Sequence, residues 1–311
     1  MTAVLTGTLV AVVLSAVSAA CHEPPAATDA EPEVWLVSSR GVPVPTASDD
    51  EVDALDGWRL REGTWHLQDP AELWRPERSS RATVVFVHGN RTAFSEEVPE
   101  AWPIYRRIRS AADGQPFRFV IWSWPSNRIR GGPRHDARVK AARSDVEAYR
   151  LAACLRRMGP ESPVTLIGYS FGARTIVGSL RLLDGGRLAG RELPEPPDED
   201  TQPRRRAVLI AAAVDAGWLA GRCGSARPLD QLERVLVTRN GCDPVLKRYP
   251  KLYGHRGPQA LGYVGVRCSG EPEKVEQFDV RCSVGRTHHW NGYLRSGGLH
   301  ERLPWYAFVG E

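Results

Sequence analysis

The sequence predicts an α/β fold in which a mostly parallel sheet is covered by helices on both faces. Continuous apolar runs of strand length alternate with longer segments of helical periodicity. Two of these runs end directly in turn-forming pairs, His88-Gly89 and Trp124-Pro125. Another run passes through a Gly-x-Ser-x-Gly turn into a helical pattern. Strand, turn and helix in repeated succession are typical of parallel sheets, in which each helix crosses back over a face.

The predicted elements follow one another from residue 34 onward. Early edge strands are expected at 34–37 and 63–67. Five further strands are expected at 82–87, 117–122, 164–167, 207–213 and 235–238. A long helix is expected at 134–158, between the second and third of these strands. A second helix follows the Gly-x-Ser-x-Gly turn. The proline-rich segment 193–203 cannot continue a helix or a central strand, so it is interpreted as a surface loop.

The N-terminal segment is interpreted as a targeting signal. Residues 1–20 are apolar and small toward their end, and Ser18-Ala19-Ala20 precedes Cys21 as in a cleavage site. Cys21 in this position resembles the lipidated cysteine of a lipoprotein, which would attach the protein to a membrane; a plain secretory signal and an uncleaved anchor remain alternatives. Residues 21–33 are rich in Pro, Ala and acids and predict a flexible tether. Residues 34–311 are expected to form one domain of an exported protein.

Composition and charge exclude several classes of function. The net charge of +4 is small for 311 residues, and the densest basic cluster, Arg204-Arg205-Arg206, leads into an apolar strand. No basic stripe with interleaved aromatics is present, so no nucleic-acid partner is expected. The chain has neither CxxC nor HxxxH spacing, so no metal is expected. Oligomeric state cannot be read from the sequence.

The cysteines suggest an oxidising compartment. Cys154 lies in a helical pattern and is interpreted as a buried thiol. The last third of the chain holds four more cysteines, which allow three pairings. The preferred pairs are Cys223 with Cys242 and Cys268 with Cys282.

Gly168-Tyr169-Ser170-Phe171-Gly172 carries the strongest functional signal of the chain. It follows the apolar strand 164–167 and precedes a helix, which is the context of a nucleophile elbow. Glycines on both sides of Ser170 let the strand and the helix approach closely. The start of the helix would direct free N–H groups at developing negative charge. Ser170 is therefore the candidate nucleophile.

A serine nucleophile needs a base and an acid, which follow an elbow serine in the order acid, then histidine. Asp243 comes shortly after the strand 235–238 and is the candidate acid, with Asp215 in reserve. Asp243-Pro244 is also a helix N-cap pattern, so Asp243 can do both only if its carboxylate faces the histidine. His288 is the preferred base and its neighbour His289 the reserve. His255 and His300 lie in polar stretches and are interpreted as surface residues.

Two backbone N–H groups are expected to form an oxyanion hole. One belongs to Phe171, directly after the nucleophile. The other is expected in the loop after strand 82–87, at Asn90. His88 in the same loop is interpreted as a structural hydrogen-bonding residue and not as a base.

These segments together resemble a known family. Val-Phe-Val-His-Gly-Asn (85–90), Ile-Trp-Ser-Trp-Pro-Ser (121–126) and Ile-Gly-Tyr-Ser-Phe-Gly-Ala-Arg (167–174) are similar to bacterial esterase/lipase-like α/β-hydrolases, over about residues 81–294. Asn90, Tyr169, Ala173 and Arg174 depart from the usual residues of these motifs.

The resemblance implies an α/β-hydrolase fold and a serine hydrolase that cleaves carboxylic esters of small-molecule acyl substrates without a cofactor. Ser170, Asp243 and His288 map onto the family's catalytic residues, and Asn90 and Phe171 onto its oxyanion donors. A non-catalytic binding scaffold and a peptidase or amidase on the same fold remain alternatives.

Overall fold

The computed structural model describes residues 31–43, 50–75, 81–194, 202–221, 226–254, 256–266 and 272–309. The expected signal segment 1–20 and Cys21 lie outside these residues, so export and lipid attachment stay predictions. The expected tether ends one residue early, because Glu33 already belongs to the first strand. There its carboxylate pairs with Arg59 and Arg81 on neighbouring segments.

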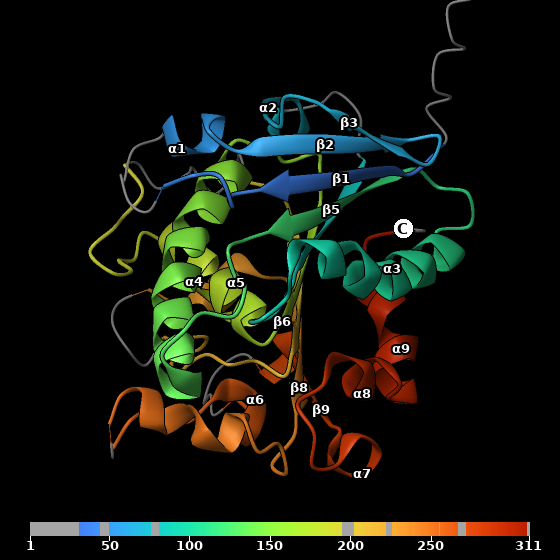
Figure 1. Cartoon of the computed structure of the whole chain (residues 1–311). Coiled ribbons are helices and arrows are strands. Elements are labelled where there is room, and N and C mark those ends of the chain that lie inside the picture. Colours follow the sequence, from blue (N-terminus) through green and yellow to red (C-terminus); the bar gives the residue numbers. More distant parts are fainter. Residues whose placement is uncertain are drawn as a thin grey trace, which may run out of the picture.

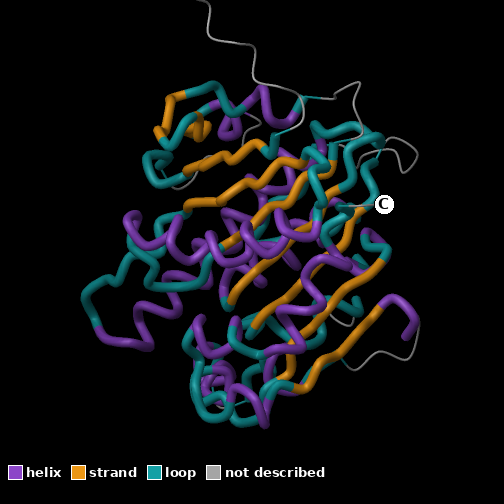
Figure 2. Tube along the Cα trace, turned by 90° about the vertical axis from the view of Figure 1, so that its right-hand side faces the viewer, coloured by secondary structure: helices purple, strands orange, loops and turns teal. Residues whose placement is uncertain are grey.

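One twisted sheet contains all nine strands of the described residues (Figure 2). Their order across the sheet is β3-β2-β1-β5-β4-β6-β7-β8-β9. The pairings β1–β2 and β2–β3 are antiparallel, whereas all others are parallel. The strands are β1 (Glu33–Ser38), β2 (Asp56–Arg61), β3 (Thr64–Leu67), β4 (Ala82–Val87), β5 (Phe117–Ser123), β6 (Val164–Tyr169), β7 (Arg205–Ile210), β8 (Arg234–Arg239) and β9 (Val275–Asp279).

Helices cover both faces of the sheet (Figure 1). The helices α4 and α5 pack on one face, and α3, α8 and α9 lie on the other. The α-helices are α1 (Asp50–Asp53), α2 (Ala71–Trp74), α3 (Phe94–Ala111), α4 (Gly132–Arg156), α5 (Phe171–Leu183), α6 (Leu261–Val264), α7 (Arg281–Val284), α8 (Trp290–Leu294) and α9 (Gly297–Arg302). Short 3₁₀ helices are η2 (Pro228–Gln231), η3 (Leu246–Leu252), η4 (Pro272–Lys274) and η5 (Leu303–Tyr306). The predicted α/β fold with a mostly parallel sheet is therefore confirmed.

Burial explains which strands the sequence reveals. Every residue of β4, β5, β6 and β7 is buried, which is why these strands appear in the sequence as continuous apolar runs. Two expectations need correction. The strand at 34–37 is not at an edge, because β1 lies between β2 and β5. The strand expected at 207–213 ends at Ile210, because Ala211 takes a left-handed backbone with φ of 47°.

Neither predicted disulfide is found among the described residues. Cys242 and Cys282 are exposed free thiols in the structure. Their expected partners, Cys223 and Cys268, lie outside the described residues. Cys154 is a buried free thiol, as predicted, and burial raises the pKa of its thiol group.

Parallel strands bring four functional segments to one edge of the sheet. The segments that follow β4, β6, β8 and β9 all leave at carboxyl ends, where ligands bind in open parallel sheets. Within the described ranges, no helix combines the length and the hydropathy needed to cross a bilayer. No group of three or more His, Cys, Asp or Glu side chains suited to a metal occurs in the same ranges.

Candidate active site

Ser170 stands at a sharp turn between β6 and α5. Its backbone has φ of 54° and ψ of −113°, a conformation that costs an L-residue about 1–3 kcal/mol. Two backbone hydrogen bonds hold it there: the Ser170 N–H donates to the Ile210 carbonyl at 2.9 Å, and the Ala213 N–H donates to the Ser170 carbonyl at 3.1 Å. The end of β7 therefore stabilises the turn.

The two glycines of the motif are required by close backbone contacts. A Cβ on Gly168 would lie 2.6 Å from the backbone N of Ala173. A Cβ on Gly172 would lie 2.0 Å from the carbonyl oxygen of Val87. Both distances are far below contact distance, so only glycine lets α5 pack against β6 and against the end of β4.

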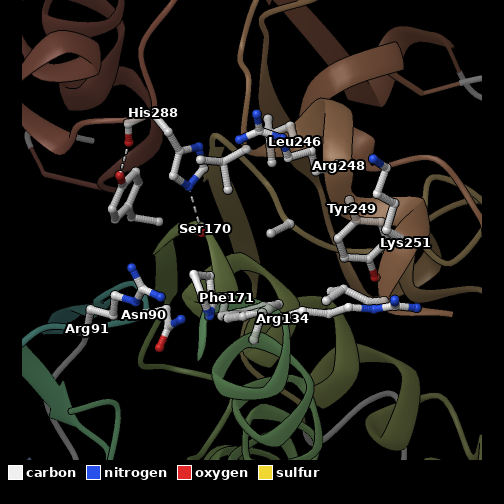
Figure 3. Close-up of a pocket in the computed structure, with 16 residues that line it drawn as sticks. Asn90, Arg91, Arg134, Ser170, Phe171, Leu246, Arg248, Tyr249, Lys251 and His288 are labelled. Atoms are coloured by element: carbon white, nitrogen blue, oxygen red, sulfur yellow. Dashed lines mark hydrogen bonds between the residues drawn. The ribbon is translucent and has the colours of Figure 1, made fainter. Parts of the chain in front are cut away.

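A chain of two hydrogen bonds links Ser170, His288 and Asp243. Ser170 Oγ lies 2.9 Å from Nε2 of His288. A dashed line marks this hydrogen bond in Figure 3. The opposite ring nitrogen, Nδ1, lies 2.6 Å from Oδ2 of Asp243. The structure thus brings together the three side chains that the sequence analysis selects, from segments more than 40 residues apart. Because a carboxylate can only accept, Nδ1 of His288 is the donor to Asp243. In the neutral tautomer with its proton on Nδ1, Nε2 is an acceptor that faces the serine hydroxyl.

Asp243 is fully buried and every hydrogen bond to it stabilises its charge. Oδ1 accepts from the backbone N–H groups of Val245 and Leu246 at 2.9 and 3.0 Å and so holds the turn that leads into η3. Oδ2 accepts from His288 and from the Tyr293 hydroxyl, the latter at 2.7 Å. Burial alone raises the pKa of this carboxyl, but the hydrogen bonds outweigh burial and hold the pKa below its ordinary value. One residue therefore both holds the turn before η3 and pairs with the histidine.

Two tyrosines fix the histidine loop, and the sequence analysis assigns a role to neither. The Tyr169 hydroxyl donates to the carbonyl of His288, and the two rings stack with centroids 5.5 Å apart. Tyr293 supports Asp243 as described and meets the His288 ring edge-on at 6.5 Å. Burial raises the pKa of both phenols, so they act as neutral donors. Tyr169 departs from the usual elbow residue, which was the available signal in the sequence.

The reserve candidates lie elsewhere. His289 is exposed, directly precedes α8 and lines a different surface hollow with Glu96 and Glu100. Asp215 accepts from the backbone N–H of Gly217 at 2.7 Å. His255 lies outside the described residues. His300 is exposed in α9, as expected.

His88 lies buried beneath the loop after β4. Its Nδ1 is 3.0 Å from the Gly89 carbonyl, and its ring stacks on Trp124 with centroids 5.7 Å apart. The backbone N–H of Trp124 donates to Nε2 of His88 at 3.3 Å. These contacts match the structural role that the sequence analysis proposes.

The two expected oxyanion donors lie beside Ser170. Asn90 and Phe171 both line the pocket that contains Ser170 and His288 (Figure 3). Phe171 is the first residue of α5, so its N–H has no acceptor in its own helix. Neither backbone N–H donates to a backbone carbonyl of another described residue. Both are therefore available to an incoming group.

A pocket of about 460 Å³ opens at Ser170. Its wall is largely apolar and comes from the β4 loop, the start of α4, the elbow and η3. The lining residues are Asn90, Arg91, Pro133, Arg134, Ala137, Tyr169, Ser170, Phe171, Ala213, Val245, Leu246, Arg248, Tyr249, Lys251, Leu252 and His288. Space of this size accommodates a small organic ligand.

Arg174, another departure from the usual elbow, ties the pocket wall to the elbow helix. Its guanidinium is buried and makes two hydrogen bonds of 2.8 and 2.9 Å with Asp145 of α4. It also donates to the hydroxyls of Tyr249 and Tyr253 at 2.9 and 2.8 Å. The guanidinium stacks over Trp218 at 4.5 Å. Arg174 thus joins α4, α5 and the η3 segment.

Fold and site together define the class of the protein, a hydrolase of α/β fold. A family model described as the alpha/beta hydrolase family matches residues 84–310. The chain belongs to the α/β-hydrolase family, which confirms the resemblance read from its motifs. The search of curated proteins yields no match.

Solved structures show more distant likeness. A His-tagged serine hydrolase involved in carbazole degradation, the CarC enzyme, is 10% identical; the match covers 81% of this chain and 94% of that one, with a TM-score of 0.36. Acyl-protein thioesterase 2 of Zea mays is 14% identical over 66% of this chain and 86% of its own, with a TM-score of 0.31. A butyrate-bound thermophilic esterase of Thermogutta terrifontis, Est2, is 12% identical over 73% and 82%, with a TM-score of 0.30.

Proposed function

We propose that this protein is a serine hydrolase that cleaves carboxylic esters. The observation that carries the proposal is the hydrogen-bonded chain Ser170–His288–Asp243, with 2.9 and 2.6 Å between the paired atoms, at the wall of a mostly apolar pocket. A hydroxyl that donates to a neutral imidazole, itself held by a buried carboxylate, is an activated nucleophile.

The proposed reaction has two halves. Ser170 Oγ attacks the ester carbonyl while Nε2 of His288 takes its proton and then gives it to the departing alcohol. A water molecule, activated by the same nitrogen, then attacks the acyl-serine and releases the acid. Asp243 keeps the imidazole in the required tautomer and stabilises its positive charge. The backbone N–H groups of Asn90 and Phe171 are the proposed donors to the developing oxyanion.

A fluorophosphonate probe tests the proposal. We expect the wild-type protein to be labelled and Ser170→Ala to remain unlabelled. Ser95→Ala removes an exposed hydroxyl of α3 and serves as the matched control that keeps its label. Hydrolysis of 4-nitrophenyl butyrate should fall by at least 10⁴-fold, or to the detection limit, in Ser170→Ala.

Two outcomes would contradict the proposal. Folded wild-type protein that takes no label and cleaves no ester is a binding scaffold. Faster cleavage of butyryl 4-nitroanilide than of the matched ester identifies an amidase or peptidase instead.

A further inference from the structure

The pocket beside Ser170 contains an unbalanced set of charges. Four cationic residues line it, namely Arg91, Arg134, Arg248 and Lys251, and no Asp or Glu is among the described residues of its wall. Figure 3 shows Arg248 and Lys251 on the side of the pocket formed by η3, with Arg134 reaching in from the α4 side. The remaining wall is mostly aliphatic or aromatic.

Only Arg91 among these four cations has a carboxylate partner in the described structure. Its Nε donates to Oδ2 of Asp136 at 2.8 Å. The side chains of Arg134, Arg248 and Lys251 are exposed, and none forms a hydrogen bond or an ion pair with another described residue. Three positive charges around one cavity, with no carboxylate partner in the described ranges, create a positive potential, which low-dielectric walls focus.

The cations lie on two elements that enclose the pocket from different sides. Arg134 is in the first turn of α4, whereas Arg248 and Lys251 are three residues apart on η3. Arg174 holds η3 against the helices through Tyr249, so the η3 cations stand on an anchored segment. Guanidinium and ammonium groups in this arrangement suit a carboxylate or a phosphate.

We propose that the pocket selects esters that carry an anionic group, a carboxylate or a phosphate, joined to the ester by an apolar stretch. The apolar wall binds that stretch, and Arg134, Arg248 and Lys251 bind the anion. This inference rests on the proposed function and names the substrate class of the same site. It leaves open which side of the ester carries the charge, and the substrates below separate the two cases.

Matched pairs of esters measure the selectivity. 4-Nitrophenyl hydrogen suberate carries a carboxylate on the acyl side, and 4-nitrophenyl methyl suberate is its neutral counterpart. 3-Carboxy-4-nitrophenyl octanoate carries the charge on the leaving group, and its carboxyl methyl ester is the neutral counterpart. We expect kcat/KM to favour the anionic member of one pair by roughly tenfold at low salt, since three exposed cations each contribute a modest factor. The ratio should fall as NaCl screens the charges.

Charge-reversal variants assign the effect. Arg248→Glu and Lys251→Glu should each lower the anionic-to-neutral ratio by roughly fivefold. Lys247→Glu is the matched control, because Lys247 is exposed on the same η3 but does not line the pocket; its ratio should stay near that of the wild type.

The outcomes separate this inference from the proposed function. The inference is overturned if the neutral esters are hydrolysed efficiently and the anionic-to-neutral ratio of kcat/KM is one or less. It is also overturned if neither Arg248→Glu nor Lys251→Glu changes that ratio. In both cases the proposed esterase activity stands. If no ester is cleaved, the proposed function fails. Calorimetric binding of monomethyl suberate then tests, without hydrolysis, whether the pocket cations bind a carboxylate. Equally weak binding to the wild type and to Lys251→Glu overturns the inference as well.

Discussion

Ser170 on one side of the site and the Asp243–His288 pair on the other are held in place by different means. The elbow is fixed by backbone: glycines admit the close contacts, and hydrogen bonds to Ile210 and Ala213 hold a strained residue. The acid and the base are fixed by side chains, because Tyr293 and Tyr169 reach them from other segments. A residue fixed by close backbone contacts tolerates few substitutions around it and is marked by a local sequence motif. A residue fixed by several side-chain hydrogen bonds can lose one of them and keep its position.

Among the variants that compare these two halves, Asp243→Asn gives the largest expected effect on activity and tests the side-chain half. An amide at this position favours the wrong histidine tautomer, so kcat should fall by roughly 10³–10⁴-fold. Steady-state kinetics with 4-nitrophenyl butyrate measure the loss. Asp215→Asn is the control, with a far smaller expected loss. Equal losses in the two variants would show that Asp215 supplies the acid.

Gly172→Ala tests the backbone half. The new Cβ would lie 2.0 Å from the Val87 carbonyl oxygen, which belongs to a central strand and cannot yield cheaply. We expect the free energy of unfolding to fall by about 3 kcal/mol, measured by urea denaturation. Gly297→Ala meets no atom within 4 Å and should change it little. Equal stability of both variants would refute the claim that close contact requires this glycine.

Tyr293→Phe removes one contact from the side-chain half. Asp243 keeps three of its four hydrogen bonds, so we expect a loss of about 1.5 kcal/mol in stability and a several-fold fall in kcat. Urea denaturation and kinetics measure both. Tyr263→Phe, on the half-buried Tyr263, is the control. An unchanged kcat in Tyr293→Phe would show that Tyr293 does not support the acid.

The smallest expected effect is the pH dependence of the contribution that Asp243 makes to the free energy of unfolding. The pKa of Asp243 is lowered in the folded protein, so its contribution is present above the unfolded value of about 4 and is lost as pH falls through the lower folded value. The stability difference between wild type and Asp243→Asn should therefore shrink from about pH 4 downward. Thermal unfolding between pH 7 and pH 3 measures it. A difference that stays constant over this range would mean that Asp243 is not held as an ionised carboxylate.

The same contrast explains what could be predicted from the sequence. β4, β5 and β6 are continuous apolar runs, and the elbow carries its own glycine pattern, so both are evident in the sequence. β2 and β9 are exposed or half-buried at most positions and mix polar with apolar residues, so neither forms a continuous apolar run that the sequence reveals. α3 was missed because Pro99 and Pro103 lie inside it.

Side-chain partners were predicted less well. Order along the chain sufficed to select Asp243 and His288, but the hydroxyls of Tyr169 and Tyr293 reach their acceptors only through tertiary packing. The predicted cysteine pairs are not found among the described residues, where Cys242 and Cys282 are free thiols. Spacing in the sequence does not determine which thiols meet.

The two carboxylate oxygens of Asp243 contact two different parts of the chain that follows it. Oδ2 serves the imidazole, while Oδ1 anchors the first turn of the segment that carries Arg248 and Lys251. Descendants of this protein could thus exchange the pocket cations Arg248 and Lys251 and acquire new substrates, provided the Asp-Pro-Val-Leu start is retained. The catalytic residues and the residues that select the substrate could then change independently, although both depend on the Asp243 carboxylate.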